Sequence, residues 1–389
     1  MIYKLSDIFD LQMGKTPTRS DLSYWQNGSY DWISISDLNT DRKYISDTKE
    51  RITTKAVRES GIKKIPANTV IMSFKLSIGK TAITSHDMFS NEAIMAFIDR
   101  KVIRINPDYI YYLLHALDWN KRANKAVKGR TVNKKIISQT QVNIPDYQTQ
   151  LRIVKIMDST RKRVKIQKDI LSKLDTLIKA RFVEMFGDPI VNPYNFKQEK
   201  LECLSCLITK GASPTWQGFN YVEDDDQTLF ITSENVKNGY LDLKKSKYVE
   251  NKFNDKHRRS ILQKGDFLIN IVGASIGRAA QYSENKLANI NQAVALVRLK
   301  SNVISSVYLS IYLNSNKALD MYQKMQSNVA RANLSLQNIK DLEIILPPIE
   351  LQNEFASFVQ QVDKSKVAIQ KSLDETQILF DSLMQKYFS

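Results

Sequence analysis

The chain has 389 residues, 42% of them hydrophobic, which is enough for two or three domains with buried cores. It carries 57 Lys and Arg against 41 Asp and Glu, and this net charge of +16 favours a polyanionic partner, nucleic acid before an anionic membrane surface. No apolar run is long enough to span a membrane, and the amino terminus has no signal-peptide pattern, so a cytoplasmic location is expected.

Gly-Lys-Thr occurs twice, at residues 14–16 and 79–81. These residues end the phosphate-binding loop of many ATPases, but that loop needs a second glycine five positions earlier. The chain has Phe9 and Phe74 there, whose side chains prevent the close approach of backbone amides to phosphate. We therefore do not expect an ATP site at either position.

The first 145 residues mix short β-like runs, such as 70–74 and 93–98, with short helical patches. The stretch 121–135 follows, with seven Lys and Arg and no acidic residue. Such a stretch is typical of a surface that tracks nucleic-acid phosphates. The alternative is a solvated helix without a partner.

Residues 146–187 and 346–389 are each expected to form one long helix, because no proline or glycine occurs between Pro145 and Gly187, or between Pro348 and the last residue. Apolar residues recur at seven-residue spacing in both segments, which favours an antiparallel coiled coil between them. About 35 helical residues would make a spacer of about 50 Å, longer than one turn of DNA. The alternative is that each helix packs on its own globular domain. The residues expected in the seam are Met157, Val164, Leu171, Ile178, Val359, Val362, Ile369, Leu373 and Phe380.

The connector from Gly187 to Pro193 is expected to end the first helix and begin a second globular part. Cys203 and Cys206 follow in Cys-x-x-Cys spacing. With three histidines far away in sequence, we favour two buried thiols over a redox pair or half of a zinc site.

The whole chain contains a tandem sequence repeat with a period of about 200 residues. The matching segments keep their order along the chain: 32–34 with 230–232, 70–73 with 267–270, 77–80 with 275–278, 91–93 with 291–293, and 144–150 with 346–352. The second copy of Ile-Gly-Lys-Thr-Ala is Ile-Gly-Arg-Ala-Ala, so the shared feature is a turn followed by one basic side chain.

No glycine-rich cofactor fingerprint opens a βαβ unit, and we nominate no catalytic or metal-binding residue. An acidic cluster at Asp226 and Asp242 with Lys244 is interpreted as a solvated loop. The candidates for DNA contact are cations and one amide, mostly in expected loops: Lys15, Arg19, Lys75, Lys80, Lys121, Arg122, Lys125, Lys128, Arg130, Arg258, Arg259, Arg278, Arg331 and Asn333. Because Arg and Asn read guanine and adenine with paired hydrogen bonds, base contacts are assigned to Arg19, Arg130, Arg278, Arg331 and Asn333.

These features resemble the specificity subunits of type I restriction-modification systems over the whole chain. The resemblance rests on Gly14-Lys15-Thr16-Pro17 with Arg19, on residues 32–38, on both Ser-Ile-Gly turns, and on Pro347-Pro348 with Glu350 and Gln352. It implies an α+β fold: a tandem duplication of a mixed α/β target-recognition domain plus a long helix, with the helices forming an antiparallel coiled-coil spacer. The implied recognition domains are residues 1–145 and 188–345, and the implied helices are residues 146–187 and 346–389.

The resemblance further implies that the chain binds a bipartite double-stranded DNA target and has no catalysis or cofactor of its own. Two methyltransferase subunits would supply adenine-N6 methylation with S-adenosylmethionine, and two restriction-motor subunits would use ATP and Mg²⁺. A self-sufficient nuclease or methyltransferase would instead show turnover by the purified chain. A membrane-surface scaffold would bind anionic vesicles.

Overall fold

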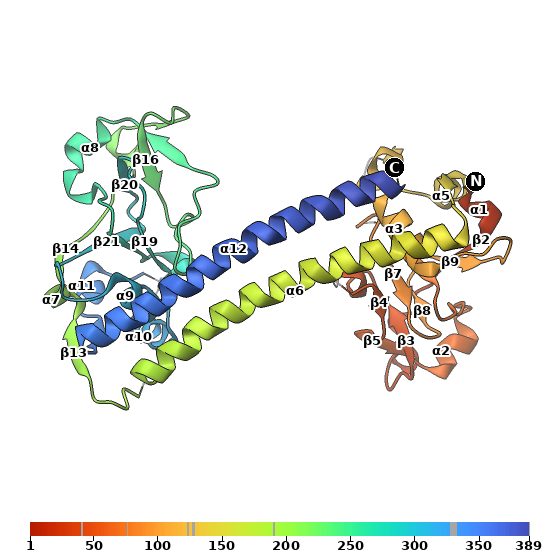
Figure 1. Cartoon of the computed structure of the whole chain (residues 1–389), viewed down its shortest axis with the longest axis horizontal. Helices are drawn as coiled ribbons and strands as arrows, with labels where there is room; N and C mark the ends of the chain where they lie inside the picture. Colours follow the sequence, from red (N-terminus) through yellow and green to blue (C-terminus); the bar gives the residue numbers. More distant parts are fainter. Residues whose placement is uncertain are drawn as a thin grey trace. The chain divides into compact units, whose positions relative to one another are not determined.

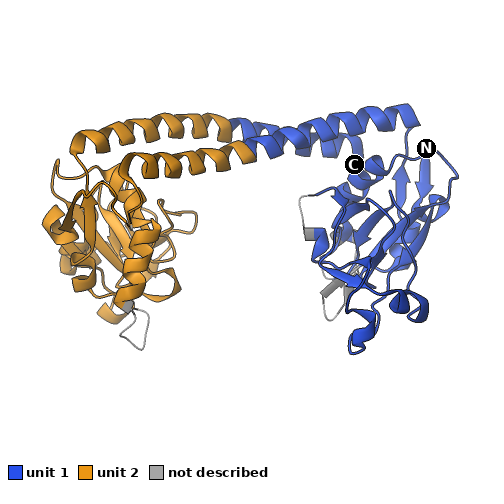
Figure 2. Cartoon of the chain, turned by 90° about the horizontal axis from the view of Figure 1, so that it is seen from below, with its two compact units in different colours: residues 1–168, 371–389 blue, residues 169–370 orange. Residues whose placement is uncertain are grey.

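A computed structural model of the chain describes residues 1–39, 42–75, 77–122, 124–126, 129–189, 191–326 and 333–388. The chain divides into two compact units, which are coloured separately in Figure 2. Unit 1 comprises residues 1–168 and 371–389, and unit 2 comprises residues 169–370. Each unit is a mixed α/β body that also includes part of both long helices (Figure 1).

Unit 1 is built on a five-stranded sheet with the order β2-β9-β6-β7-β4 and a three-stranded sheet with the order β5-β3-β8. The strands are β2 (Phe9–Met13), β9 (Ile94–Asp99), β6 (Val70–Ser73), β7 (Thr81–Thr84), β4 (Tyr44–Ile45), β5 (Glu50–Ile52), β3 (Tyr30–Ile33) and β8 (Phe89–Ser90). Two ladders complete the unit: β1 (Ile2–Lys4) with β12 (Gln141–Asn143), and β10 (Asn124–Ala126) with β11 (Gly129–Thr131). Its short helices are α1 (Leu5–Ile8), α2 (Thr54–Glu59), α3 (Pro107–Ala116), α4 (Trp119–Arg122), α5 (Lys134–Gln139), η1 (Leu22–Tyr24) and η2 (Asp37–Asn39).

Unit 2 repeats this arrangement with the sheet orders β14-β21-β18-β19 and β15-β17-β16-β20. The strands are β14 (Ser205–Lys210), β21 (Val294–Leu299), β18 (Phe267–Asn270), β19 (Ala279–Gln281), β15 (Tyr221–Val222), β17 (Lys247–Val249), β16 (Thr228–Ile231) and β20 (Ala288–Ile290). The ladder of β13 (Lys197–Lys200) with β22 (Glu343–Leu346) corresponds to β1 with β12. Its short helices are α7 (Leu201–Leu204), α8 (Phe253–Lys256), α9 (Ser306–Leu313), α10 (Asn316–Gln326), α11 (Leu336–Lys340), η3 (Thr215–Gln217), η4 (Arg258–Ser260) and η5 (Gly273–Ser275).

The two copies share topology and not only sequence order. In both, the first strand of the main sheet pairs antiparallel with a strand that in turn pairs with the strand before the Ser-Ile-Gly turn. In both, the second sheet contains one parallel pair, β3 with β8 and β16 with β20. The expected tandem duplication of a mixed α/β domain is therefore confirmed.

The expected long helices are confirmed as α6 (Tyr147–Phe186) and α12 (Ile349–Phe388), each of 40 residues. A buried glutamine fixes the start of each. The Gln150 side chain accepts from the Asn106 amide at 2.8 Å and donates to the Pro145 carbonyl at 2.9 Å. Gln352 does the same with Ser305 and Pro347, at 2.9 and 2.8 Å. Each glutamine thereby ties the first turn of a long helix to the cap of α3 or α9.

The nine residues expected in the helix seam are all buried or half-buried. Met157, Ile178, Val359, Val362 and Leu373 are buried, and Val164, Leu171, Ile369 and Phe380 are half-buried. Within unit 1, Gln167 donates to Ser372 at 2.8 Å. Within unit 2, Lys366 pairs with Asp175 at 2.5 Å and Arg181 pairs with Glu354 at 3.2 Å. The helices thus run antiparallel and contact each other in both units.

The helix ends also pack on the globular part of their own unit. In unit 1, Met157 of α6 and Phe388 of α12 belong to the same core as the α3 tyrosines. In unit 2, Phe182 and Phe186 of α6 contact both Tyr308 of α9 and Phe355 of α12. Pairing between helices and packing on the domain, which the sequence left as alternatives, therefore occur together.

The expectation that Cys203 and Cys206 are buried is wrong, because both are exposed. Leu201 and Leu204 occupy the inward side of the single turn α7, which directs Cys203 outward. Cys206 lies where the β14 register shifts between Ser205 and Leu207. The local turn and bulge, and not the apolar context in the sequence, decide the exposure of the two thiols.

Candidate nucleic-acid interface

One edge of the main sheet in unit 1 gathers several of the basic candidates. Met13 at the end of β2 pairs with Met95 near the start of β9. Met95 also pairs with Met72 of β6, and Met72 pairs with Thr81 at the start of β7. The loops after β2, before β9 and between β6 and β7 therefore leave the sheet at the same edge, which we call the loop edge.

Backbone hydrogen bonds bind these loops to one another. The Lys15 amide donates to the Ser90 carbonyl at 2.8 Å, and the Phe74 amide donates to the Ala93 carbonyl at 3.0 Å. The Val132 amide donates to the Phe74 carbonyl at 3.4 Å, so the β10–β11 hairpin also joins the loop edge. The fold thus brings Lys15, Arg19, Lys75 and the described β10–β11 hairpin to one side of the unit, although more than 100 residues separate Lys15 from Val132.

The Arg19 guanidinium lies over two tryptophan rings, a contact that the sequence did not predict. It lies 3.9 Å from the Trp25 ring centre and 4.8 Å from that of Trp32. Glu50 binds both terminal nitrogens, and this hydrogen bonding raises the pKa of Arg19. The paired N–H groups that would bind guanine are therefore hydrogen-bonded to a carboxylate. Arg19 can read a base only if it breaks these hydrogen bonds to Glu50.

Lys15 and Lys75 are differently placed from Arg19. Lys15 is exposed, and its carbonyl accepts the Trp32 indole N–H at 3.1 Å. Lys75 lies over the Phe74 ring at 5.4 Å, close to Glu92. The Thr16 hydroxyl hydrogen bond and the nearby cations Lys75 and Arg19 lower the pKa of Glu92. The acid balances part of the positive charge at this edge.

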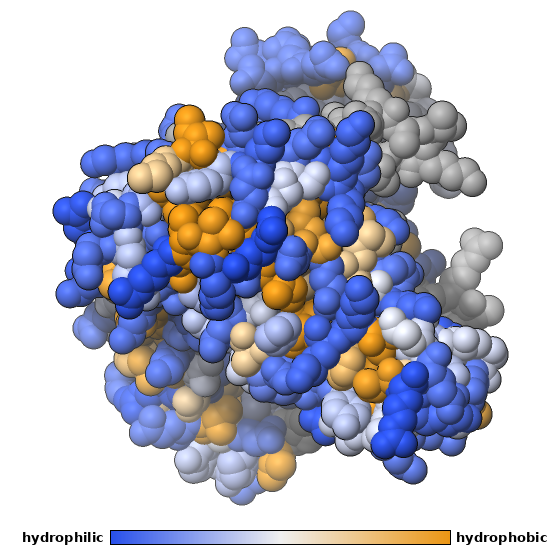
Figure 3. Space-filling view, turned by 90° about the vertical axis from the view of Figure 1, so that its right-hand side faces the viewer, coloured by the Kyte–Doolittle hydropathy of each residue, from blue (hydrophilic) through white to orange (hydrophobic). Residues whose placement is uncertain are grey.

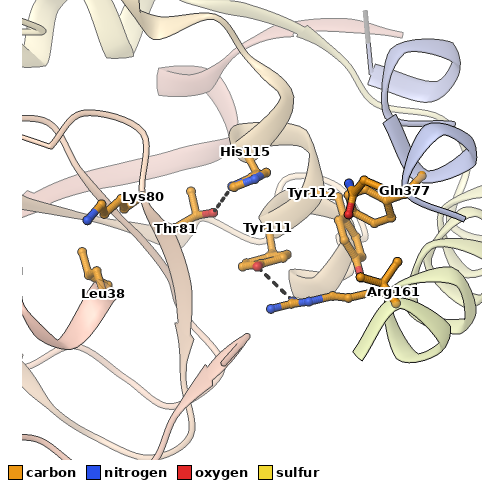
Figure 4. A pocket seen from close by; sticks show the side chains of 10 residues that line it. Leu38, Lys80, Thr81, Tyr111, Tyr112, His115, Arg161 and Gln377 are labelled. Carbon is orange, nitrogen blue, oxygen red and sulfur yellow. Dashed lines mark hydrogen bonds between the residues drawn. The ribbon is translucent and has the colours of Figure 1, made fainter. Parts of the chain in front are cut away.

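Lys80 lines a cavity of about 350 Å³ inside unit 1. Figure 4 shows Lys80 and Leu38 on one side and Tyr111, His115 and Arg161 on the other. Arg161 donates to the Tyr111 hydroxyl at 3.0 Å. Burial, together with the charge of Arg161, lowers the pKa of His115. Lys80 therefore borders a cavity that residues of α6 and α12 also line.

The basic stretch 121–135 does not form a single helix, which was the alternative that the sequence left open. It comprises the end of the short helix α4, the antiparallel β10–β11 hairpin with Lys125 opposite Arg130, and the start of α5. Lys121 is exposed and lies 3.6 Å from Asp118. Lys128 falls outside the described residues, and for Arg122, Lys125 and Arg130 the backbone alone is described.

Unit 2 has the same loop edge with other side chains. Arg278 is half-buried and follows the second Ser-Ile-Gly turn, and Asn333 is exposed beside Val272 in an antiparallel bridge. Arg331 lies outside the described residues. Arg258 and Arg259 are exposed but elsewhere, because η4 is joined through the Ile261 carbonyl to Arg298 near the far end of β21.

The Ser-Ile-Gly turns owe their glycine to shape. Gly79 and Gly277 both have φ of +86°, a left-handed conformation that other residues rarely adopt. An aromatic ring lies against each: Trp119 would be 3.0 Å and Tyr322 2.4 Å from an added Cβ. The repeated Ser-Ile-Gly motif is therefore a packed turn under an aromatic ring.

Comparison with known proteins assigns the chain to a family. The model of the type I restriction modification DNA specificity domain matches residues 1–176 and 217–377, most of the chain. The chain belongs to this family, and is a type I specificity subunit. The MjaIX specificity subunit of Methanocaldococcus jannaschii is 22% identical over 99% of this chain and 91% of its own length. The EcoBI specificity subunit of Escherichia coli is 29% identical over 55% of this chain and 45% of its own length.

Solved structures share the fold of this specificity subunit. The S subunit of a type I restriction-modification system from M. genitalium covers 100% of this chain and 96% of its own, with a TM-score of 0.57 and 12% identity. A chain from a structure of complex assembly and conformational transition of the type I R-M system has a TM-score of 0.65, 16% identity, and coverage of 100% and 97%. The resemblance deduced from the sequence motifs is confirmed.

The described part of the specificity subunit contains no group of three or more His, Cys, Asp or Glu side chains placed to hold a metal ion. In the same residues, no helix is both long and apolar enough to cross a membrane. On the face drawn in Figure 3, apolar side chains form separate groups between hydrophilic ones.

Proposed function

We propose that this specificity subunit reads a bipartite double-stranded DNA target. Residues 1–145 and 188–345 act as the two target-recognition domains, and each presents its loop edge to one half of the target. The observation that carries this proposal is the duplicated edge, where the same framework holds Lys15, Lys75 and Arg19 in one copy and Arg278 and Asn333 in the other. Constant backbones with different side chains are what two independent half-site readers require.

In this proposal the chain has no catalysis and binds no cofactor. It docks two methyltransferase subunits, which methylate adenine with S-adenosylmethionine, and two restriction-motor subunits, which use ATP and Mg²⁺. The segments 146–187 and 346–389 serve as the spacer between the recognition domains. Family membership supports these partners, as does the likeness to a chain from a structure concerned with assembly of the type I R-M system.

Domain exchange tests the proposal. The chain is coexpressed with a cognate methyltransferase subunit, and the methylated motif is identified by methylome sequencing. Replacing residues 1–145 by the equivalent segment of another family member should change one half of the motif and leave the other intact. Altered sequence in both halves would contradict independent half-site reading.

The purified chain provides the control for catalysis. Alone, it should bind DNA without methylating it and without hydrolysing ATP, and adenine methylation should require the methyltransferase subunit. Lys15→Ala and Lys80→Ala should leave ATP hydrolysis by the full complex unchanged at equal DNA occupancy, because neither lysine belongs to a phosphate-binding loop. Turnover by the isolated chain would refute the recognition-subunit proposal.

A further inference from the structure

Trp216 is the most exposed large apolar side chain in the described part of the chain, with 85% of its surface accessible. The other tryptophans are covered: Trp25 is half-buried, and Trp32 and Trp119 are 1% and 3% exposed. No described residue makes a ring contact or hydrogen bond with the Trp216 side chain. An indole that stays exposed to water gains no free energy from apolar burial. Its exposure therefore points to a ligand that covers it.

The fold places Trp216 where unit 1 has Arg19. Gly14 and Gly211 each end a first strand and each lie so close to a neighbouring carbonyl that an added Cβ would be 2.2 Å from the Ser90 oxygen or 1.8 Å from the Ile290 oxygen. The next five residues correspond in sequence: Lys-Thr-Pro-Thr-Arg follows Gly14, and Ala-Ser-Pro-Thr-Trp follows Gly211. Pro17 and Pro214 are both buried, and the two residues after each are exposed.

The surroundings of Trp216 suit a polyanion. Its loop leaves the same edge of unit 2 as the Ser-Ile-Gly turn, which carries Arg278, and the bridge that carries Asn333. The last residue of β16, Ile231, lies at the loop edge, because its carbonyl accepts from the Asn291 amide at 3.0 Å. The acidic run 223–226 precedes the opposite end of β16 and so is directed away from that edge. Glu234 is paired with Lys247 at 3.2 Å.

We propose that the Trp216 indole stacks on a base of the second half-site, so that the second recognition domain reads DNA with an aromatic side chain where the first presents the Arg19 guanidinium. This inference rests on the proposed function. An aromatic ring among polar and cationic groups is the arrangement with which proteins stack on bases, either at a kinked base step or on an unpaired base. Because Thr215–Gln217 form one 3-10 turn held by the buried Pro214, the ring is presented without a long flexible loop.

The test uses the full chain with its methyltransferase subunits and a short duplex carrying the methylated motif. Trp216→Ala should weaken binding by ~10–100-fold, and Trp216→Phe should weaken it less because a ring remains. Gln217→Ala, at the exposed next position of the same turn, is the matched control and should bind like wild type. Scrambling the second half-site should remove the difference between wild type and Trp216→Ala, whereas scrambling the first should preserve it.

Fluorescence supplies a readout independent of affinity. The difference in emission between wild type and Trp216→Phe isolates Trp216, and the duplex should shield this signal from acrylamide. Shielding by methyltransferase subunits without DNA would assign Trp216 to a protein contact and overturn the inference, as would a bound duplex that leaves Trp216 fully quenchable. If the wild-type complex fails to bind the duplex, the proposed function itself fails, and the stacking inference fails with it.

Discussion

Single residues hold the duplicated framework together by shape. Gly277 combines a φ of +86° with the Tyr322 ring 2.4 Å from any added Cβ, whereas the Trp119 ring leaves 3.0 Å at Gly79. Gly277→Ala should destabilise unit 2 by about 2–4 kcal/mol, because the left-handed backbone and the displaced ring both cost free energy. Gly79→Ala should cost about 1–2 kcal/mol, mainly from the backbone. Thermal unfolding of both variants measures this order, and a larger loss for Gly79→Ala would contradict it.

The buried glutamines act by hydrogen bonding. Gln352 is 0% exposed and satisfies the Ser305 amide and the Pro347 carbonyl. Gln352→Leu would leave both backbone groups buried and unpaired, so we expect a loss of about 2–4 kcal/mol of unfolding free energy. Gln360→Leu, at an exposed position of the same helix, is the control and should unfold like wild type. Denaturant unfolding measures this difference. Equal unfolding midpoints for the two variants would show that the hydrogen bonds of the buried glutamine are not needed for stability.

At the scale of elements, α6 and α12 depend on aromatic packing where they join unit 2. Phe355 is fully buried, and its ring centre lies 5.6 Å from that of Phe182 and 5.3 Å from that of Phe186. Phe355→Ala should cost about 3–5 kcal/mol through lost burial and the cavity that remains. Val367, on the same helix, is 71% exposed, so Val367→Ala should be close to neutral. Calorimetry of the two variants tests this, and a neutral Phe355→Ala would show that the helix does not depend on this cluster.

At the scale of the whole molecule, two continuous helices of 40 residues each have residues in both units. If they act as the spacer, adding one heptad to both changes the separation of the recognition domains by about 10 Å, or close to three base pairs. A heptad restores the helix seam, but the DNA half-site turns by roughly a hundred degrees over three base pairs. Most such insertions should abolish methylation, and those that survive should lengthen the gap in the motif while both half-site sequences persist.

The spacer experiment inserts or deletes four to seven residues between Lys162 and Asp175, with a matching change between Lys364 and Gln377, and reads the methylome. Circular dichroism confirms that each variant keeps its helix content. A variant that methylates new half-site sequences at the old gap would refute the spacer role.

The sequence by itself determined the duplication, the family and the two long helices. These depend on local rules: the absence of proline and glycine, seven-residue spacing, and motif order repeated at a fixed period. It also excluded phosphate-binding loops, because Phe9 and Phe74 stand where glycine is required.

Only the tertiary structure decided which candidates share a surface and which are already engaged. The sequence predicts that Arg19 reads a base, yet Glu50, thirty-one residues away, hydrogen-bonds to its guanidinium. Trp216 corresponds to Arg19 in sequence order, but only the structure shows that its indole is exposed while the Arg19 guanidinium is covered by two tryptophan rings. The sequence predicts that Cys203 and Cys206 are buried, and both are exposed in the structure. The physical reason is that exposure and pairing are set by contacts between segments far apart in sequence, which periodicity and spacing do not encode.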